Sequence, residues 1–359
     1  MVIKDLITNE IFEQSGYTAP SYSSDVRIRL DANENPFRLQ EPLKKKLLEE
    51  MGRIDFNRYP VAGSPGLRER FAGHFGVDQD MVMPGNGSDE LIQILCLALK
   101  GIINGVLVPV PTFAMYKIIA INTGNKVVEV PLGANFDLDT EAMLAKIASN
   151  FPALVFLSYP NSPTGNLFSR DKIEAILKET PGVVVVDEAY GAFAGETLAP
   201  LLKKYDNLLI LKTLSKLGMA SMRLGFLIGN KDIIAELDKV RLPYNINSLS
   251  QIAGNFFLDY RMEFAEQVQE VVKRREELYL AMKEIEGIKP YPSRANFIYF
   301  SCIFDSNRIY AHMTAAGIYL KNLNRPPQTT NCMRVTVGNL EENAAFIKAL
   351  KSGISELGA

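Results

Sequence analysis

The chain has 359 residues, of which 47% are hydrophobic and 22% are charged, a balance typical of a globular protein that buries its own core. At about 150 residues per domain, this length predicts two domains. Lysine and arginine number 39 against 41 aspartates and glutamates, a net charge of −2, which argues against nucleic acid as a partner because general nucleic-acid binders carry a basic excess.

Cysteine and histidine are too few and too scattered for several common kinds of site. Cys96, Cys302 and Cys332 lie far apart and form no CxxC pair, which favours reduced thiols over disulfides. The two histidines, His74 and His312, have no metal-ligand spacing, so we expect no metal site. A hydrolase of the Ser-His-Asp type is not favoured either, since the sequence has no GxSxG motif.

Residues 1–35 are expected to form an N-terminal arm outside the main sheet. The first twelve residues lack the apolar core of a signal peptide. The most apolar long stretch, Leu91–Val110, is interrupted by Lys100 and by glycine and proline, so it predicts a helix, a turn and a strand rather than a membrane span. We therefore expect a cytoplasmic protein without a membrane partner.

Between about residues 80 and 230, short runs of Val, Ile and Leu alternate with helical patterns. This alternation predicts an α/β fold with a mainly parallel sheet covered by helices on both faces. Ligands of such sheets bind at the carboxyl ends of the strands. The expected strands are Met81–Met83, Gly105–Val110, Lys126–Val130, Ala153–Ser158, Val183–Val186, Leu208–Leu211 and Leu224–Ile228, and the helices between them include Asp89–Leu99, Thr140–Ala148 and Arg170–Lys178.

After Leu249 the pattern changes. Residues Gln251–Glu286 form a nearly continuous helical pattern rich in Glu, Lys and Arg, and strands are expected near Asn296–Phe300, Ile318–Leu320 and Met333–Val337. The sequence thus predicts a large domain over residues 36–248 and a smaller α+β domain over residues 249–359.

Charged side chains follow two of the expected strands. Val183–Val186 leads directly into Asp187 at the end of a buried strand, although an aspartate there also suits the N-cap of a following helix. Lys216 follows the next strand, and a solvated surface lysine is the alternative reading. Ser215 and Arg223 favour a functional role, because together they form an anion site beside an amine.

Two further loops add polar groups at the same edge of the sheet. Two prolines and a glycine hold Asn161 in a rigid turn, Ser158–Gly165. The segment Pro84–Glu90 places glycines before a helix, where backbone N–H groups can approach a phosphate. The four loops together supply the acid, the amine and the phosphate cup that pyridoxal 5′-phosphate (PLP) chemistry needs.

The sequence resembles the fold-type I PLP-dependent aminotransferases, of which aspartate aminotransferase is an example, and among them most resembles the histidinol-phosphate aminotransferases. The resemblance implies a large PLP-binding domain with a mainly parallel, seven-stranded sheet. The matching segments keep their order over nearly the whole chain: Asp31–Phe37, Arg58–Pro60, Gly85–Leu91, Pro111–Tyr116, Asn161–Gly165, Val186–Tyr190, Thr213–Lys216, Pro243–Asn247 and Met333–Gly338.

The resemblance implies a role for each residue around the cofactor ring. Lys216 is the lysine that forms the Schiff base and moves a proton between the substrate and the cofactor. Asp187 pairs with the pyridine nitrogen, which keeps the nitrogen protonated. Asn161 and Tyr190 hydrogen-bond the ring hydroxyl oxygen. Phe113 stacks on the ring, where the family more often has tyrosine.

The phosphate group of the cofactor has its own set of residues by the same resemblance. The backbone of Ser88 and Asp89 and the side chains of Ser215 and Arg223 hold it. Tyr59 resembles a tyrosine that reaches the phosphate of the neighbouring subunit. The resemblance therefore implies a homodimer with shared active sites.

Substrate recognition is assigned to four residues. Arg334 resembles the arginine that binds the distal phosphate of the amino donor and the carboxylate of the 2-oxo acid. Lys321, thirteen residues earlier, stands where the family often has a second arginine, and Arg325 is a candidate to compensate. Lys321 ends the expected strand Ile318–Leu320 and Arg334 lies in Met333–Val337, so adjacent strands could direct both cations into one pocket. Tyr17 and Asn33 complete the expected substrate pocket.

The resemblance leaves three functions open. The first is transamination between L-histidinol phosphate and 2-oxoglutarate. The second is another PLP reaction, either aromatic amino-acid transamination or decarboxylation of the threonine-phosphate type. The third is a non-catalytic PLP-binding protein, which the presence of Lys216, Asp187 and Arg223 disfavours.

Overall fold

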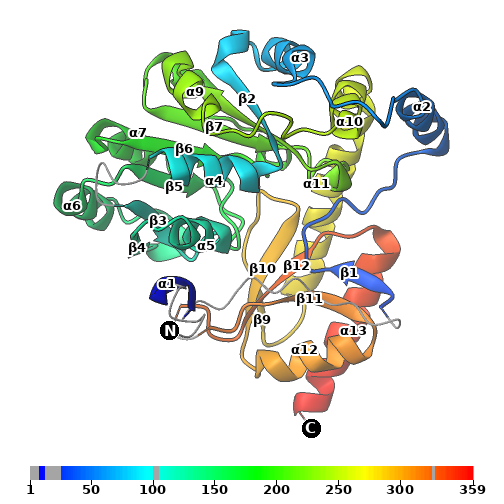
Figure 1. Ribbon diagram of the computed structural model, residues 1–359. Coiled ribbons are helices and arrows are strands. Elements are labelled where there is room, and N and C mark those ends of the chain that lie inside the picture. The colour runs from blue at the N-terminus through cyan, green and yellow to red at the C-terminus, as the bar shows by residue number, and fades with distance from the viewer. Residues whose placement is uncertain (1–7, 13–25, 100–104, 326–327, 359) are drawn as a thin grey trace, which may run out of the picture.

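A seven-stranded sheet forms the centre of the larger part of the molecule in the computed structural model, which describes residues 8–12, 26–99, 105–325 and 328–358 (Figure 1). Its strand order is β2-β8-β7-β6-β5-β3-β4, and the pairs from β7 to β4 are parallel. β8 runs antiparallel to β2 and β7. The mainly parallel sheet expected from the sequence is confirmed. Its strands are β2 (Val82–Asn86), β3 (Val106–Val110), β4 (Val127–Pro131), β5 (Leu154–Ser158), β6 (Val183–Asp187), β7 (Leu208–Thr213) and β8 (Leu224–Gly229).

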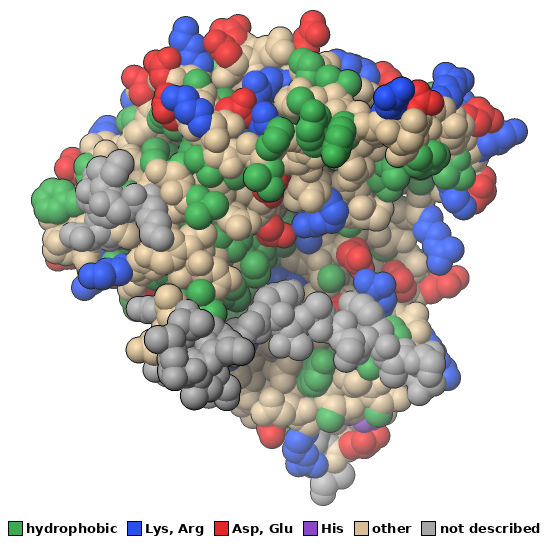
Figure 2. All heavy atoms as spheres, viewed as in Figure 1, with side chains coloured by type: hydrophobic (Ala, Val, Ile, Leu, Met, Phe, Trp, Pro, Cys, Tyr) green, Lys and Arg blue, Asp and Glu red, His purple; other side chains and the backbone are tan. Residues whose placement is uncertain are grey.

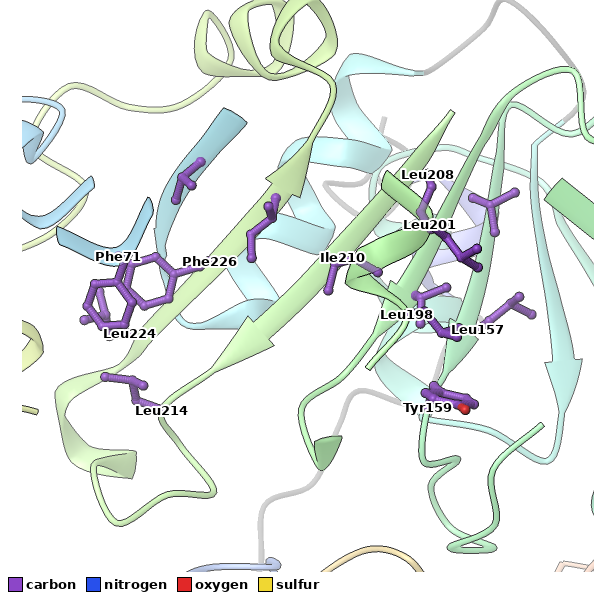
Figure 3. Packing of buried hydrophobic residues seen from close by; sticks show 14 of the residues in the cluster. Phe71, Leu157, Tyr159, Leu198, Leu201, Leu208, Ile210, Leu214, Leu224 and Phe226 are labelled. Carbon is purple, nitrogen blue, oxygen red and sulfur yellow. The ribbon is translucent and has the colours of Figure 1, made fainter. Parts of the chain in front are cut away.

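Both faces of this sheet are buried because successive side chains of a strand point to opposite sides. Val184 and Val186 of β6 pack with residues of α3 (Pro65–Phe75), α6 (Thr140–Asn150), α7 (Arg170–Glu179) and α10 (Ser248–Asp259). Val185 packs with residues of α4 (Ser88–Ala98), α5 (Ala114–Asn122) and α9 (Lys231–Asp238). Figure 3 shows part of the first cluster, in which Phe226 stacks on Phe71 with ring centroids 3.8 Å apart. By the same alternation, the side chain that follows Val186 belongs to the face covered by α5.

Helices connect the strands of the large sheet and cover it. The long α11 runs from the large sheet to the smaller part of the molecule (Figure 1). The helices are α1 (Asn9–Phe12), α2 (Glu41–Met51), α3 (Pro65–Phe75), α4 (Ser88–Ala98), α5 (Ala114–Asn122), α6 (Thr140–Asn150), α7 (Arg170–Glu179), α8 (Gly191–Ala194), α9 (Lys231–Asp238), α10 (Ser248–Asp259), α11 (Arg261–Lys283), α12 (Ser306–Ala315) and α13 (Leu340–Gly358), with 3₁₀ turns at Gln79–Met81, Ala134–Phe136, Ala199–Lys203 and Ala220–Met222.

A second sheet has five strands in the order β1-β11-β12-β10-β9, and residues of α11 and α13 pack against it. β1, from the segment expected to be an arm, runs parallel to β11, and the other pairs are antiparallel. The predicted domain boundaries stay a prediction, but β1 lies in the small sheet and α10 packs on the core of the large sheet. The strands are β1 (Ile28–Leu30), β9 (Ile288–Pro290), β10 (Phe297–Cys302), β11 (Ile318–Asn322) and β12 (Cys332–Thr336).

The nearly continuous helical pattern expected over Gln251–Glu286 is present, and a single residue divides it into two helices. The break is at Tyr260, whose φ of −112° and ψ of 28° are not helical. The two helices pack on different cores: Phe256 of α10 lies in the core of the large sheet, and Leu278 of α11 lies in the core of the small sheet. A periodic polar pattern contains no signal for such a change of direction.

Candidate active site

Lys216 lies in the loop after β7, where the predicted site residues meet. The N–H of Ser215 donates to Thr213 Oγ1 at 3.1 Å, and the Thr213 hydroxyl donates to Ser215 Oγ at 3.0 Å, which holds the start of the loop. Lys216 Nζ donates to the carbonyl of Ala32 at 3.1 Å and lies 5.9 Å from the ring centroid of Tyr190. Lys216 is half-buried, so it is not the solvated surface lysine that the sequence left open.

Asp187 is the last residue of β6, and its carboxylate is buried on the α5 side of the sheet. The Tyr116 hydroxyl donates to Oδ2 at 2.7 Å and the Ala189 N–H donates to Oδ1 at 2.9 Å. Burial raises the pKa of Asp187 from 3.8 to about 6, although both hydrogen bonds act to lower it. Within the described ranges, Asp187 forms no ion pair, so a cationic group bound beside it would offset the desolvation of the carboxylate.

The loops that carry Asp187 and Lys216 leave the sheet side by side. Asp187 opposes Leu211 in the parallel pair of β6 and β7, and the Glu188 N–H donates to the Leu211 carbonyl at 2.8 Å. The buried carboxylate of Glu188 accepts a hydrogen bond from Lys212 at 2.6 Å. These two adjacent residues therefore have different surroundings: among the described residues, Glu188 has a cationic partner and Asp187 does not.

Arg223 and the N-terminus of α4 form an anion-binding corner. Arg223 donates to Ser215 Oγ at 3.2 Å and pairs with the Asp89 carboxylate at 3.1 Å. Its φ of 48° is a left-handed conformation, uncommon outside glycine and concentrated at functional sites. Gly225 allows β8 to lie close to the start of α4, since a Cβ at this position would be 2.8 Å from the carbonyl carbon of Gly87. These contacts bring a guanidinium to the start of a helix, an arrangement that suits a phosphate.

Asn161 is fully buried in the loop after β5, and its amide is engaged. Nδ2 donates to the Pro111 carbonyl at 3.0 Å and to Thr164 Oγ1 at 2.7 Å, and Oδ1 accepts from the Thr112 hydroxyl at 2.9 Å. An amide has two N–H donors. A contact from Asn161 to a cofactor oxygen therefore requires one of these bonds to be shared or exchanged.

Asn33 joins the N-terminal segment to both sheets. Its Nδ2 donates to the Tyr190 hydroxyl at 2.9 Å, which leaves the tyrosine proton available to another acceptor. The Asn33 N–H donates to Thr336 Oγ1 at 3.0 Å, and its carbonyl accepts from Asn296 at 3.0 Å. Asn33, expected in the substrate pocket, thus directly contacts a residue expected to bind the cofactor.

Lys321 and Arg334 lie opposite each other on the antiparallel strands β11 and β12, as their spacing predicted. Arg334 donates to the Asp31 carbonyl at 2.8 Å and to Ser162 Oγ at 3.2 Å, so it reaches the loop that contains Asn161. Burial and the charge of Arg334 lower the pKa of Lys321. Like charges opposite each other on paired strands repel, and a bound anion would relieve this repulsion.

Tyr59 lies on the surface, with 81% of the residue exposed. Its ring stacks on Tyr244 with centroids 4.6 Å apart. Phe56 and Val61 on the same loop are also exposed, a pattern typical of surfaces that contact another protein. Tyr17 lies outside the described residues.

Tyr116 is the residue of this site to which the sequence analysis gave no role. Its ring stacks on Phe156 with centroids 4.6 Å apart and meets the Phe113 ring edge-on at 5.4 Å. Tyr116 ends the segment Pro111–Tyr116, three residues after Phe113, and this helical spacing could have indicated that both rings share one face.

The residues of the site fit PLP. Asp187 offers a buried carboxylate to a protonated ring nitrogen, and Lys216 offers an amine to an aldehyde. Arg223, Ser215 and the N-terminus of α4 offer donors to a phosphate, and in the part of the chain with described coordinates no side chain caps that helix.

Charges of both signs alternate over the face of the molecule shown in Figure 2. A search of the described ranges finds no group of three His, Cys, Asp or Glu residues that could hold a metal ion. None of the helices in those ranges is long and apolar enough to cross a membrane.

Residues 26–350 match the family model of aminotransferase class I and II. The chain is 46% identical over 329 residues to histidinol-phosphate aminotransferase 2 of Nitrosococcus oceani, covering 91% of both chains, and 42% identical over 332 residues to histidinol-phosphate aminotransferase of Aquifex aeolicus, covering 92% of this chain and 93% of the relative. The crystal structure of histidinol-phosphate aminotransferase from Sinorhizobium meliloti in complex with PLP superimposes with a TM-score of 0.86 at 21% identity, covering 98% of both chains. This likeness confirms the expected aminotransferase fold.

Proposed function

The chain belongs to aminotransferase class I and II, and from this membership we propose that it transfers the amino group of L-histidinol phosphate to 2-oxoglutarate in histidine biosynthesis. It is an enzyme of PLP-dependent transamination. The choice of substrate is supported by the names of its relatives and by the paired cations Lys321 and Arg334.

The buried carboxylate of Asp187 is the observation that carries this function. When bound, PLP supplies an aldehyde carbon and a ring that accepts electron density. Asp187 holds the proton on the ring nitrogen, on which the electron-accepting character of the ring depends. The same proton provides the cation that Asp187 lacks among the described residues.

When PLP is bound, Lys216 would act as the base through Nζ and would move a proton between the substrate Cα and the cofactor carbon C4′. Its hydrogen bond to the Ala32 carbonyl and its position beside the Tyr190 ring hold the amine among the other residues of the site. Tyr190 would donate its hydroxyl proton to the ring oxygen, and Phe113 would stack on the ring. Asn161 would also donate to the ring oxygen, once Nδ2 gives up its hydrogen bond to Pro111 or to Thr164.

The phosphate of the cofactor is bound at the N-terminus of α4. Arg223 and Ser215 bind it through their side chains, and Ser88 and Asp89 through their N–H groups. Arg223 pairs with the carboxylate of Asp89, so a bound phosphate would share the Arg223 guanidinium with Asp89. This anchor fixes the ring against Asp187 and Lys216.

Two variants test the assignment of the substrate phosphate. We expect Arg334→Ala to lower kcat/KM for both histidinol phosphate and 2-oxoglutarate by about ten- to a hundred-fold, because one charge-assisted hydrogen bond contributes about 1.5–3 kcal/mol. We expect Lys321→Ala to lower kcat/KM mainly for histidinol phosphate, because a dianion gains more from a second cation than a carboxylate does. Lys289→Ala, a lysine of the same small sheet on β9, is the control. Unchanged kinetics with histidinol phosphate in Lys321→Ala would contradict the phosphate assignment.

We also propose a homodimer in which Tyr59 reaches the active site of the partner subunit. The exposed Tyr59 and Tyr244 rings support an interface there. Tyr59→Ala and Lys216→Ala are each expected to be inactive. After mixing, each heterodimer has one site with both defects and one with neither, so activity should return to about a quarter of the wild-type value under random exchange. A fully active monomer in sedimentation experiments would refute this model.

A panel of amino donors tests the proposed reaction as a whole. We expect the highest kcat/KM with histidinol phosphate, in comparison with histidine, phenylalanine, tyrosine and threonine phosphate. A preference for phenylalanine would favour the aromatic aminotransferase, and release of CO₂ from threonine phosphate would favour the decarboxylase. Loss of the visible absorbance of bound PLP on addition of donor excludes a non-catalytic protein.

A cytoplasmic location is also proposed, because the three cysteines are buried free thiols, typical of reducing compartments.

A further inference from the structure

We propose that Tyr116 is a positioning residue that keeps the carboxylate of Asp187 ionised and aimed for its contact with the cofactor. This inference rests on the PLP function proposed above. It assigns a role to a side chain that does not itself need to touch the cofactor or the substrate.

The geometry places Tyr116 where it acts on one atom of Asp187. The hydroxyl donates to Oδ2 at 2.7 Å, and the Ala189 N–H occupies Oδ1 at 2.9 Å, so each carboxylate oxygen accepts one fixed hydrogen bond. Two hydrogen bonds to different oxygens define the plane of the carboxylate, and each oxygen keeps lone-pair capacity for a further donor.

Tyr116 is itself held by packing. Its ring is fully buried, stacks parallel to Phe156 and meets Phe113 edge-on. The alternation of β5 and β6 puts Phe156 and Asp187 on the face of the sheet that α5 covers, so the register of the sheet brings the three side chains together. Because Phe113 is expected to stack on the cofactor, Tyr116 supports both the acid and the stacking ring.

The carboxylates around Asp187 favour its protonated form, and the hydrogen bond from the neutral Tyr116 hydroxyl opposes this effect. Asp89 on α4 and the adjacent Glu188 both act to raise the pKa of Asp187, in the same direction as burial. Burial and the charge of Asp187 raise the pKa of Tyr116 well above its usual range, so its hydroxyl keeps its proton and donates at every working pH. The charge of an ionised Tyr190 acts in the same direction on the pKa of Tyr116. Removal of the Tyr116 hydroxyl leaves the Ala189 N–H as the donor to Asp187 among the described residues.

The test follows the titration of Asp187 in the full-length apoprotein by ¹³C NMR of its carboxyl carbon, assigned with Asp187→Asn. A hydrogen bond to a charged group changes the proton affinity by about ten- to a hundred-fold, so Tyr116→Phe should move the Asp187 midpoint upward by about one to two pH units. Affinity for added PLP should fall several-fold at neutral pH and recover in alkaline solution. Tyr159→Phe is the matched control, since Tyr159 is a buried residue directly after β5 and its hydroxyl lies 3.5 Å from the Glu196 carboxylate.

A second replacement tests the same bond in the opposite direction. A ring-fluorinated tyrosine at position 116 keeps the shape of the side chain and is a stronger hydrogen-bond donor, so the Asp187 midpoint should move downward. An unchanged midpoint in both proteins would overturn the proposal and leave Tyr116 a packing residue. Displaced midpoints in a protein that does not bind PLP would uphold the effect of Tyr116 on Asp187 and would refute the proposed function instead.

Discussion

Replacement of Lys216 by alanine is expected to abolish transamination and leave the protein folded. The variant loses the amine that binds the cofactor and moves the proton, so turnover should fall by more than about 10⁴-fold. The stability loss should be small, about 1 kcal/mol, because the side chain is half-buried and makes one hydrogen bond to the described residues, at the Ala32 carbonyl. Steady-state kinetics and thermal unfolding measure the two effects.

Lys212→Ala is the matched control on the same segment. Lys212 pairs with the buried carboxylate of Glu188 at 2.6 Å, so its removal should destabilise the protein by a few kcal/mol. Turnover per folded molecule should persist, because the amine of Lys216 is intact. Near wild-type turnover in Lys216→Ala would show that another group performs the proton transfer.

The second large effect is expected in Asp187→Asn, whose turnover should fall by about 10²–10³-fold. The amide is neutral and cannot hold the positive charge of the protonated ring nitrogen. Asp139→Asn is the control for the capping alternative, because Asp139 caps α6 through Ala142 and asparagine is an equally good N-cap. Unchanged kinetics in Asp187→Asn would show that Asp187 is only a local cap.

The pH dependence of the apoprotein reports the same group. The folded pKa of about 6 lies above the ordinary aspartate pKa of 3.8, so between these values the folded state binds more protons than the unfolded state. Stability therefore falls as pH rises through this window, by on the order of 3 kcal/mol. Asp187→Asn should remove this loss, and so it should be more stable than wild type above pH 6. Urea unfolding of both apoproteins across the window measures the difference.

Cofactor affinity should change with pH in the opposite sense. Ionised Asp187 attracts the protonated ring nitrogen, so wild-type affinity for PLP should decrease as pH falls through about 6. Asp187→Asn should show weaker affinity and a smaller step near that pH, because the phosphate of PLP also titrates at about pH 6. A step of equal size in the variant would assign the titration to another group.

Most strands of the large sheet were predictable because they are short apolar runs. The exception is β2, where Met81–Met83 was expected and the strand is Val82–Asn86, which continues through Pro84 and Gly85. The four valines Val183–Val186 next to Asp187 were enough to place a carboxyl at the end of a buried strand. The loop around Lys216 was recognisable from its small polar neighbours. The positions of Lys321 and Arg334 on two consecutive expected strands also predicted that the two residues lie close together, and they oppose each other on β11 and β12.

The contact between Tyr116 and Asp187 was decided by tertiary structure. It depends on the order of the strands and on which face of the sheet α5 covers, and neither is encoded within a few residues of either side chain. The reach of Arg334 to Asp31 and Ser162 joins segments distant in the chain. The break at Tyr260 has the same origin, because its two helices bury their apolar residues in different cores. Local patterns record backbone preference and periodicity, whereas these features follow from burial summed over the whole chain.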